Sequence, residues 1–249
     1  MGRWENEKMI RMFIGSSSNG EDCTIEAAYE YSLRKHTDEE IDITWMRQTP
    51  DIDDVWYHNN TERWSTPFSG YRWFIPEHCN FEGRAIYTDC DMINFKDINE
   101  LWETDLKGKP IAARKGVRFG GHEFCVMVID CEAIKDHLIP ISRQKNIAEY
   151  HHRMIGLFSG NEDLVEELDP RWNCLDGEDY EIDDIWHLHY TNMATQPWQP
   201  EWYVGPKKEH PRKDIERLYY NWTKEATTIG GYGLYEPGRV IEDYDIIGQ

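Results

Sequence analysis

The chain has 249 residues, of which 39% are hydrophobic and 13% aromatic, so it carries enough apolar material for a packed core and is not a disordered protein. Its 27 basic and 47 acidic residues give a formal net charge of −20, which argues against nucleic acid and anionic lipid as main partners because both are negatively charged. The six cysteines lack the close spacing of zinc or redox motifs. The sequence contains no run of about 18 apolar residues, the length that a membrane-spanning helix needs.

These properties predict one soluble, cytoplasmic domain over residues 1–249, because a single core can serve a chain of roughly 250 to 300 residues. We expect reduced core thiols, with a secreted, disulfide-bonded protein as the alternative. A phosphorylated ligand would need a cation or a local basic patch to offset the negative surface.

The first elements predict a β-α-β unit. An apolar strand at residues 9–14 leads into small polar residues at 15–20, a helix at about 23–34 and a second strand at 41–46. Such a unit builds a parallel sheet whose binding face lies at the carboxyl ends of its strands. The polar residues after the first strand would therefore line that face, and a simple turn is the alternative.

Later elements alternate between strands and helices, which completes an α/β fold with a mainly parallel central sheet flanked by helices. A polar loop precedes a buried helix at residues 68–78, and a short strand at 84–88 leads directly into Asp89-Cys90-Asp91. Further strands are expected at 110–113, 123–130 and 185–190, and further helices at 97–103, 133–137, 144–157 and 212–224.

Asp-x-Asp occurs three times, at Asp51/Asp53, Asp89/Asp91 and Asp243/Asp245. Only the middle copy follows an apolar strand, so only it places carboxylates at the end of a core strand, where burial is costly unless a cation or hydrogen bonds compensate. Hard divalent ions such as Mn²⁺ or Mg²⁺ take carboxylate and diphosphate oxygens as ligands. The pattern therefore predicts a metal site at Asp89 and Asp91, with a turn or helix cap as the alternative.

Three blocks in order carry a family resemblance. The segment FSGYRWFIPEHCNFEGRAIYTDCDMINFKDINELWETDL, residues 68–106, resembles the central signature of glycosyltransferase family eight, which includes glycogenin, lipopolysaccharide galactosyltransferases and their bacterial and viral relatives. LDPRWNCLDG at residues 168–177 resembles the family's LDPxWNxLxG segment. HYTNMATQPW at residues 189–198 resembles its HFTxGGPW and HYxGxxKPW endings.

This resemblance implies a GT-A fold and roles for individual residues. Asp89, Asp91 and His189 would hold the metal, with His187 as the rival ligand two residues away, and an imidazole suits Mn²⁺ better than Mg²⁺. Arg72 would lie near the diphosphate or the second carboxylate. The nucleotide would contact Gly15, Ser16, Ser17, Asn19, Arg72 and Asp89. The nucleotide-binding half would span about 9–106, and the half that completes the metal and acceptor sites about 107–230.

Two departures from the family pattern matter. Gln196 stands where relatives ending in KPW carry a diphosphate-binding lysine, so Lys207, Lys208, Arg212 or the metal alone would have to meet the phosphate charge. Around Gln144 the family's acidic DQ pair is missing, which leaves Gln144 as a weak catalytic candidate and no assignable nucleophile. For the acceptor, the aromatic residues Trp198, Trp202 and Tyr203 offer stacking faces, with a structural wall as the alternative.

The function implied by the resemblance is transfer of a hexose from a nucleoside-diphosphate sugar, most simply a UDP-sugar, to a hydroxyl acceptor with retention at the anomeric carbon. Catalysis would rest on stabilising the leaving group and positioning the acceptor. The alternatives are a catalytically inactive, sugar-nucleotide-binding or scaffolding relative, and a nucleotidyltransferase. The second lacks support because no glycine-rich, lysine-containing loop lies near the N-terminus.

Overall fold

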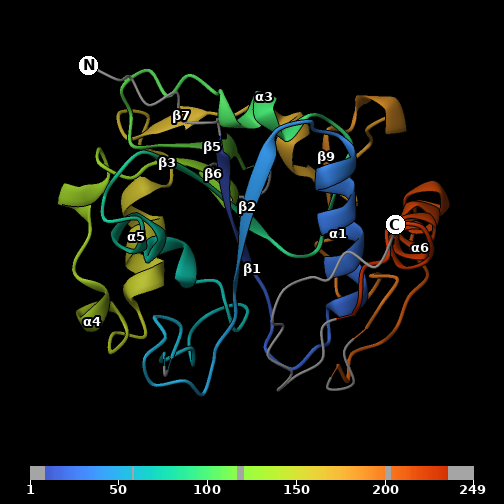
Figure 1. Ribbon diagram of the computed structural model, residues 1–249, viewed down its shortest axis with the longest axis horizontal. Coiled ribbons are helices and arrows are strands. Elements are labelled where there is room, and N and C mark those ends of the chain that lie inside the picture. The colour runs from blue at the N-terminus through green and yellow to red at the C-terminus, as the bar shows by residue number, and fades with distance from the viewer. Residues whose placement is uncertain (1–8, 58, 117–120, 200–202, 235–249) are drawn as a thin grey trace.

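A six-stranded sheet runs through the middle of the molecule (Figure 1). The computed structural model describes residues 9–57, 59–116, 121–199 and 203–234. The strands lie in the order β2-β1-β3-β6-β5-β7. Their bounds are Met9–Gly15 (β1), Glu40–Met46 (β2), Arg84–Asp89 (β3), Ile111–Lys115 (β5), His122–Asp130 (β6) and Val165–Glu167 (β7).

The sheet is mainly parallel, with β6 running against its neighbours. β1 pairs in parallel with β2 and β3, and β5 pairs in parallel with β7. β6 is antiparallel to both β3 and β5. The predicted fold class, an α/β protein with a mainly parallel central sheet, is confirmed, although the sequence pattern contained no sign of the direction of β6.

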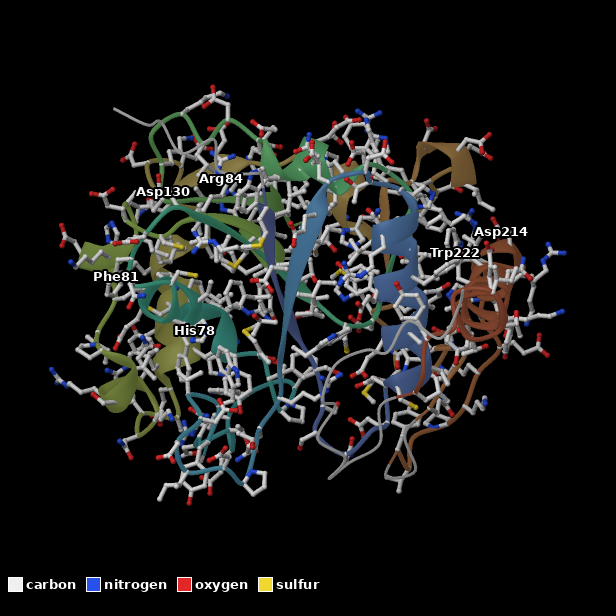
Figure 2. The ribbon with its side chains drawn as sticks, viewed as in Figure 1. His78, Phe81, Arg84, Asp130, Asp214 and Trp222 are labelled. Carbon is white, nitrogen blue, oxygen red and sulfur yellow. The ribbon has the colours of Figure 1, made fainter. Side chains whose placement is uncertain are left out.

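Helices cover both faces of this sheet (Figure 1). On one side lie α1, Cys23–Lys35, and outside it α6, Lys213–Thr228. Trp222 of α6 lies on the side that faces α1, 5.9 Å from the ring of Tyr31 (Figure 2). On the other side α5, Tyr150–Phe158, packs Phe158 parallel to the ring of Trp73 at 5.6 Å. The core therefore continues from the sheet into both helical layers.

A second sheet of three short strands lies beside α1. It has the order β4-β9-β8, with bounds Met92–Asn94 (β4), Cys174–Leu175 (β8) and His187–His189 (β9). β4 starts directly after the Asp-Cys-Asp segment and pairs Met92 with His189. The amide of Tyr190 also donates to the carbonyl of Asp91 at 2.9 Å. The small sheet thus brings a segment from the last third of the chain to the end of β3.

The helix predicted at residues 68–78 is wrong as a single element. The structure has a 3₁₀ turn at Tyr71–Trp73 and a separate helix α2 at Ile75–His78, with Pro76 in its first turn. Proline is tolerated there because the first N–H groups of a helix have no intrahelical partner. Similarly, the helix expected at 144–157 divides into α4, Ile141–Gln144, and α5.

The remaining elements are short. α3 spans Ile98–Trp102, inside the helix expected at 97–103, and Asp97 caps it by accepting a hydrogen bond from the amide of Asn99 at 3.0 Å. Other 3₁₀ turns are Lys135–His137, Pro170–Asn173 and Ile182–Asp184. Within the described ranges, none of the helices has the length and apolar character needed to cross a membrane.

Candidate functional site

The polar loop after β1 and the carboxylates after β3 meet because the two strands are parallel neighbours. Their register pairs Gly15 with Asp89. A Cβ atom on Gly15 would lie 2.6 Å from Cδ2 of Phe68 and 3.0 Å from the hydroxyl oxygen of Tyr87. Glycine at this position lets the loop start close to the carboxylate without displacing the aromatic rings below it.

Asp89 is buried and held by two donors. The Tyr87 hydroxyl donates to Oδ1 of Asp89, and Nη2 of Arg72 donates to the same oxygen at 3.2 Å. Burial raises the pKa of Tyr87 well above its usual range, so its hydroxyl remains a donor. Arg72 is itself buried, with its guanidinium 4.4 Å from the centre of the Tyr87 ring. It therefore contacts the first aspartate, whereas the resemblance allowed the second.

Asp91 faces His189 across the ends of β3 and β9. Nε2 of His189 lies 3.2 Å from Oδ1 of Asp91, and its Nδ1 lies 2.9 Å from the side-chain oxygen of Asn173. Because that oxygen can only accept, Nδ1 carries a proton, and in the neutral ring Nε2 presents a lone pair. Asp91 Oδ1 is buried and has no hydrogen-bond donor of suitable geometry among the described residues. Two acceptors facing each other require a cation or a proton between them.

Cys125 completes a cluster of metal-ligating side chains. Among the described residues, a carboxylate oxygen of Asp89, the sulfur of Cys125 and a ring nitrogen of His189 all lie within 4.8 Å of one another. Cys125 comes from β6, whose register places Val126 beside Thr88 of β3. The sequence pattern did not single it out, because a lone cysteine in an apolar strand is indistinguishable from a core residue.

The charges of this cluster favour a bound cation. Burial raises the pKa of Asp91. Burial also opposes charge on His189, yet its pKa is raised because the carboxylates of Asp91 and Asp89 lie beside it. His187, by contrast, is fully buried against Tyr29, and burial lowers its pKa to about 3. The geometry therefore gathers Asp89, Asp91 and His189 and leaves His187 in the core.

Structural comparison identifies the fold. An active-site mutant of LgtC matches with a TM-score of 0.61 at 15% identity, over 88% of this chain and 97% of that chain. The glycosyltransferase GlyE of Streptococcus pneumoniae TIGR4 matches with a TM-score of 0.60 at 18% identity, over 87% of this chain and 61% of GlyE. The bifunctional glycosyltransferase WbbM matches with a TM-score of 0.61 at 13% identity, over 91% of this chain and 52% of WbbM.

The chain has the GT-A fold of these glycosyltransferases. No protein-family model matches the sequence, and no curated protein does. The likeness is therefore one of fold, and the chain spans only part of GlyE and WbbM.

In this GT-A protein the hydroxyls of the loop after β1 bind acidic side chains. Ser16 donates to Glu26, while Ser17 donates to Glu21 at 2.8 Å and to Asp22 at 2.7 Å. Asn19 is exposed, and its side-chain amide donates to Glu21 at 2.8 Å. These contacts fix the shape of the loop beside Asp89, and Asn19 presents its side chain to solvent.

The aromatic and catalytic candidates have separate roles in the structure. Trp198 is buried, donates from Nε1 to Asp22 at 2.9 Å and stacks on Tyr219 at 5.0 Å, which fits the structural alternative. Tyr203 is half-buried, and Trp202 lies outside the described residues. Gln144 is buried, and its amide donates to the carbonyl of Ile139 at 2.7 Å, so it stabilises the chain around α4.

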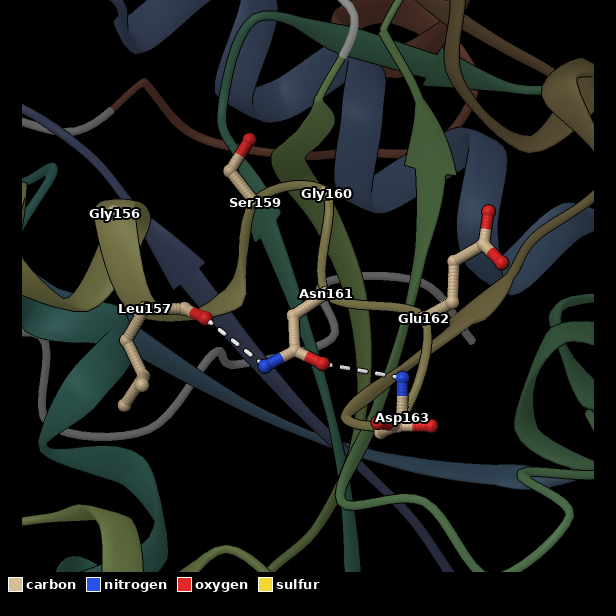
Figure 3. A pocket seen from close by; sticks show the side chains of 7 residues that line it. All are labelled: Gly156, Leu157, Ser159, Gly160, Asn161, Glu162 and Asp163. Atoms are coloured by element: carbon tan, nitrogen blue, oxygen red, sulfur yellow. Dashed lines mark hydrogen bonds between the residues drawn. The ribbon is translucent and has the colours of Figure 1, made fainter.

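An open pocket lies at the end of α5 (Figure 3), and none of the residues of the cluster lines it. It is lined by Gly156, Leu157, Ser159, Gly160, Asn161, Glu162 and Asp163. None of these was predicted as a site residue, and the carboxylates of Glu162 and Asp163 would repel a diphosphate.

The basic residues predicted as candidates for the diphosphate lie on the last third of the chain. Arg212 is paired with Asp214 and donates to the carbonyls of Glu178 and Tyr180 at 3.0 and 2.8 Å. Its guanidinium is thus occupied within the protein. Lys207 and Lys208 are exposed.

Proposed function

We propose that this protein is a metal-dependent glycosyltransferase that moves a hexose from a nucleoside-diphosphate sugar, with a UDP-sugar as the first donor to test, to a hydroxyl acceptor. One observation carries the proposal: Asp89, Asp91 and His189 meet at the end of β3, beside the loop that follows β1. The GT-A fold supports it, and the LgtC structure determined with donor and acceptor sugar analogues is described as that of a galactosyltransferase.

The residues present fit a divalent cation. Asp91 Oδ1 lacks a well-oriented donor, and the tautomer of His189 that Asn173 selects leaves Nε2 free to act as a ligand. Tyr87 and Arg72 both donate to one oxygen of Asp89, which fixes the orientation of that carboxylate. A bound cation would offset the negative charge of the leaving nucleoside diphosphate.

The loop from Gly15 to Asn19 is assigned to the nucleoside. It leaves the carboxyl end of a parallel strand, where ligands of open α/β sheets bind. The close approach at Gly15 puts this loop next to Asp89, so one donor molecule can contact the loop with its nucleoside and the cluster with its diphosphate.

The resemblance to glycosyltransferase family eight supports transfer with retention. We assign it to attack on the same face of the sugar, because Gln144 is tied to backbone carbonyls and no nucleophile is assigned beside the cluster among the described residues. In this mechanism the chain positions the acceptor and stabilises the leaving group. An inactive relative that binds sugar nucleotides is the second candidate, favoured by Gln196, which donates to the carbonyl of Tyr190 at 2.9 Å where relatives carry lysine.

Release of nucleoside diphosphate separates the two candidates. We expect purified protein with Mn²⁺ to release UDP from at least one UDP-hexose in a panel of sugar nucleotides, and to stop when EDTA is added. Thermal stabilisation by the same compounds without any release would instead identify a binding protein. Absence of both binding and release across uridine, guanosine and thymidine diphosphate sugars would overturn the proposal.

A further inference from the structure

The metal-ligating cluster contains a thiol, which hard-ion sites do not need. Cys125 is half-buried at residue level, and its sulfur lies within 4.8 Å of a carboxylate oxygen of Asp89 and a ring nitrogen of His189. In a tetrahedral site, donor atoms that share an ion at 2.0 to 2.3 Å are about 3.3 to 3.8 Å apart, so side-chain adjustments of about 1 Å would bring all three onto one ion.

Two neighbouring contacts hold this sulfur at the cluster. Arg72, which donates to Asp89, also donates to the backbone carbonyl of Phe124, the residue before Cys125. β6 continues from Cys125 in antiparallel pairing with β3, starting at Val126 opposite Thr88. The guanidinium and the sheet therefore fix the same short segment from which the thiol projects.

The unsatisfied carboxylate oxygen of Asp91 gives a second, separate reason to place a ligand here. Nε2 of His189 is buried and faces Asp91 Oδ1, which lacks a well-oriented donor. With Cys125 added, the donor set has one sulfur, one nitrogen and two carboxylates. Soft thiolate sulfur favours Zn²⁺ and similar borderline ions, whereas Mg²⁺ and Mn²⁺ favour oxygen.

We propose that Cys125 is a metal ligand that shifts the preference of this site from Mn²⁺ and Mg²⁺ toward thiophilic divalent ions such as Zn²⁺ and Co²⁺. On binding, the sulfur–hydrogen bond breaks, the proton goes to solvent and a sulfur–metal bond forms with no change in oxidation state. The inference rests on the proposed function only in placing a divalent cation at Asp89, Asp91 and His189.

Co²⁺ is the sharpest probe, because a thiolate bound to Co²⁺ gives an intense near-ultraviolet charge-transfer absorption that oxygen and nitrogen ligands do not give. Metal-free protein titrated with Co²⁺ should develop this absorption with one-to-one stoichiometry. Cys125→Ser should lose it, while Cys23→Ser, which alters another half-buried thiol, should keep it.

Calorimetric affinities complete the test. The ratio of Zn²⁺ to Mn²⁺ affinity should fall on the order of 100-fold in Cys125→Ser, because the sulfur matters to Zn²⁺ and little to Mn²⁺. If Cys125→Ser fails to fold, Cys125→Ala replaces it in the same measurements. The Co²⁺ spectrum of the wild-type protein tests the proposal without any variant.

The outcomes separate this inference from the proposed function. If Co²⁺ binds to the wild-type protein without charge-transfer absorption, and Mn²⁺ binding still depends on Asp91, Cys125 is not a ligand although the metal site stands. If neither ion binds, or if binding persists in Asp91→Asn, the metal site and the inference are both overturned.

Discussion

Asn173 shows how a side chain outside the cluster can determine what the cluster binds. Asn173 is fully buried, and its side-chain oxygen accepts a hydrogen bond from Nδ1 of His189. This contact directs Nε2 of the same ring toward Asp91. Its own backbone carbonyl accepts a hydrogen bond from buried Arg114. The polar network therefore extends from the cluster into the second half of the chain.

Asn173→Ala should weaken Mn²⁺ binding by about 10- to 100-fold, as expected when the partner that orients a metal-bound histidine is lost. Calorimetric titration measures this, with Asn161→Ala, which alters a half-buried asparagine that does not belong to the cluster, as the control. Equal Mn²⁺ affinity in Asn173→Ala and wild type would show that His189 needs no such partner.

Asp91→Asn keeps the size of the side chain but removes a ligand charge. We expect this variant to lose about 2 to 4 kcal/mol of transition-state stabilisation, the scale of a single charge-stabilising group, and its turnover rate to fall accordingly. Asp51→Asn should leave turnover nearly unchanged, because Asp51 lies in an exposed turn. The third copy, Asp243/Asp245, lies outside the described residues. Steady-state turnover of Asp91→Asn and Asp51→Asn with a UDP-sugar tests this prediction. Equal losses of turnover in the two variants would contradict the assignment of Asp91 as a metal ligand.

At residue level the sequence could point to Asp89, Asp91 and His189 because each sits in a recognisable block, and the structure brings the three together. Their binding of a metal stays a prediction. Cys125 and Asn173 could not be found this way. Their contribution depends on strand pairings and turns between segments far apart in sequence.

At the level of elements, helices and strands with a strong apolar pattern were predicted correctly from the sequence, whereas very short strands were missed. β1, α1, β2 and α6 follow clear apolar patterns and lie close to the expected ranges. β4 has three residues and β8 has two, which is too few for a periodic pattern to appear in the sequence. The pairing of β4 with β9 nevertheless places His189 beside Asp91. The fold class was therefore predictable and the small sheet was not.

The end of β1 tolerates no side chain. Gly15→Ala would place a methyl group against Phe68 and the Tyr87 hydroxyl that holds Asp89, so we expect a loss of about 1 to 3 kcal/mol of folding stability and weaker Mn²⁺ binding. Gly156→Ala in α5 is the control. It meets nothing within 4 Å and should stabilise the helix by about 0.5 to 1 kcal/mol. Chemical denaturation measures both, and an unchanged Gly15→Ala would contradict the packing described.

Asp22 links the loop after β1 to Trp198, and burial raises its pKa from 3.8 to about 6. The folded state thus holds this proton more tightly than the unfolded state, so the contribution of Asp22 to stability is lost as pH rises from about 4 to 6. Asp22→Asn cannot ionise and can still accept from Trp198. It should therefore exceed wild type in stability at pH 7.5 by up to roughly 3 kcal/mol, and by much less at pH 4.

Denaturation at the two pH values tests this link. Asp38→Asn, at an exposed carboxyl, is the control and should show no such difference. A wild-type protein that remains more stable than Asp22→Asn at pH 7.5 would mean that the ionised carboxylate contributes favourably.

On the scale of the whole molecule, the net charge of −20 determines how a diphosphate can be held. Three arginines are already occupied by carboxylates: buried Arg72 pairs with Asp89, buried Arg114 with Glu178, and the partly buried Arg212 with Asp214. The lysine candidates, Lys207 and Lys208, are exposed, where single ion pairs contribute little. A cation at the cluster is therefore expected to supply most of the attraction for the donor.

Calorimetric titration of the protein with a UDP-sugar, in Mn²⁺ and in EDTA, tests this claim most directly. We predict that donor affinity falls by at least about 100-fold when the metal is removed, since one cation at a diphosphate supplies several kcal/mol. Binding in EDTA as tight as in Mn²⁺ would contradict the account.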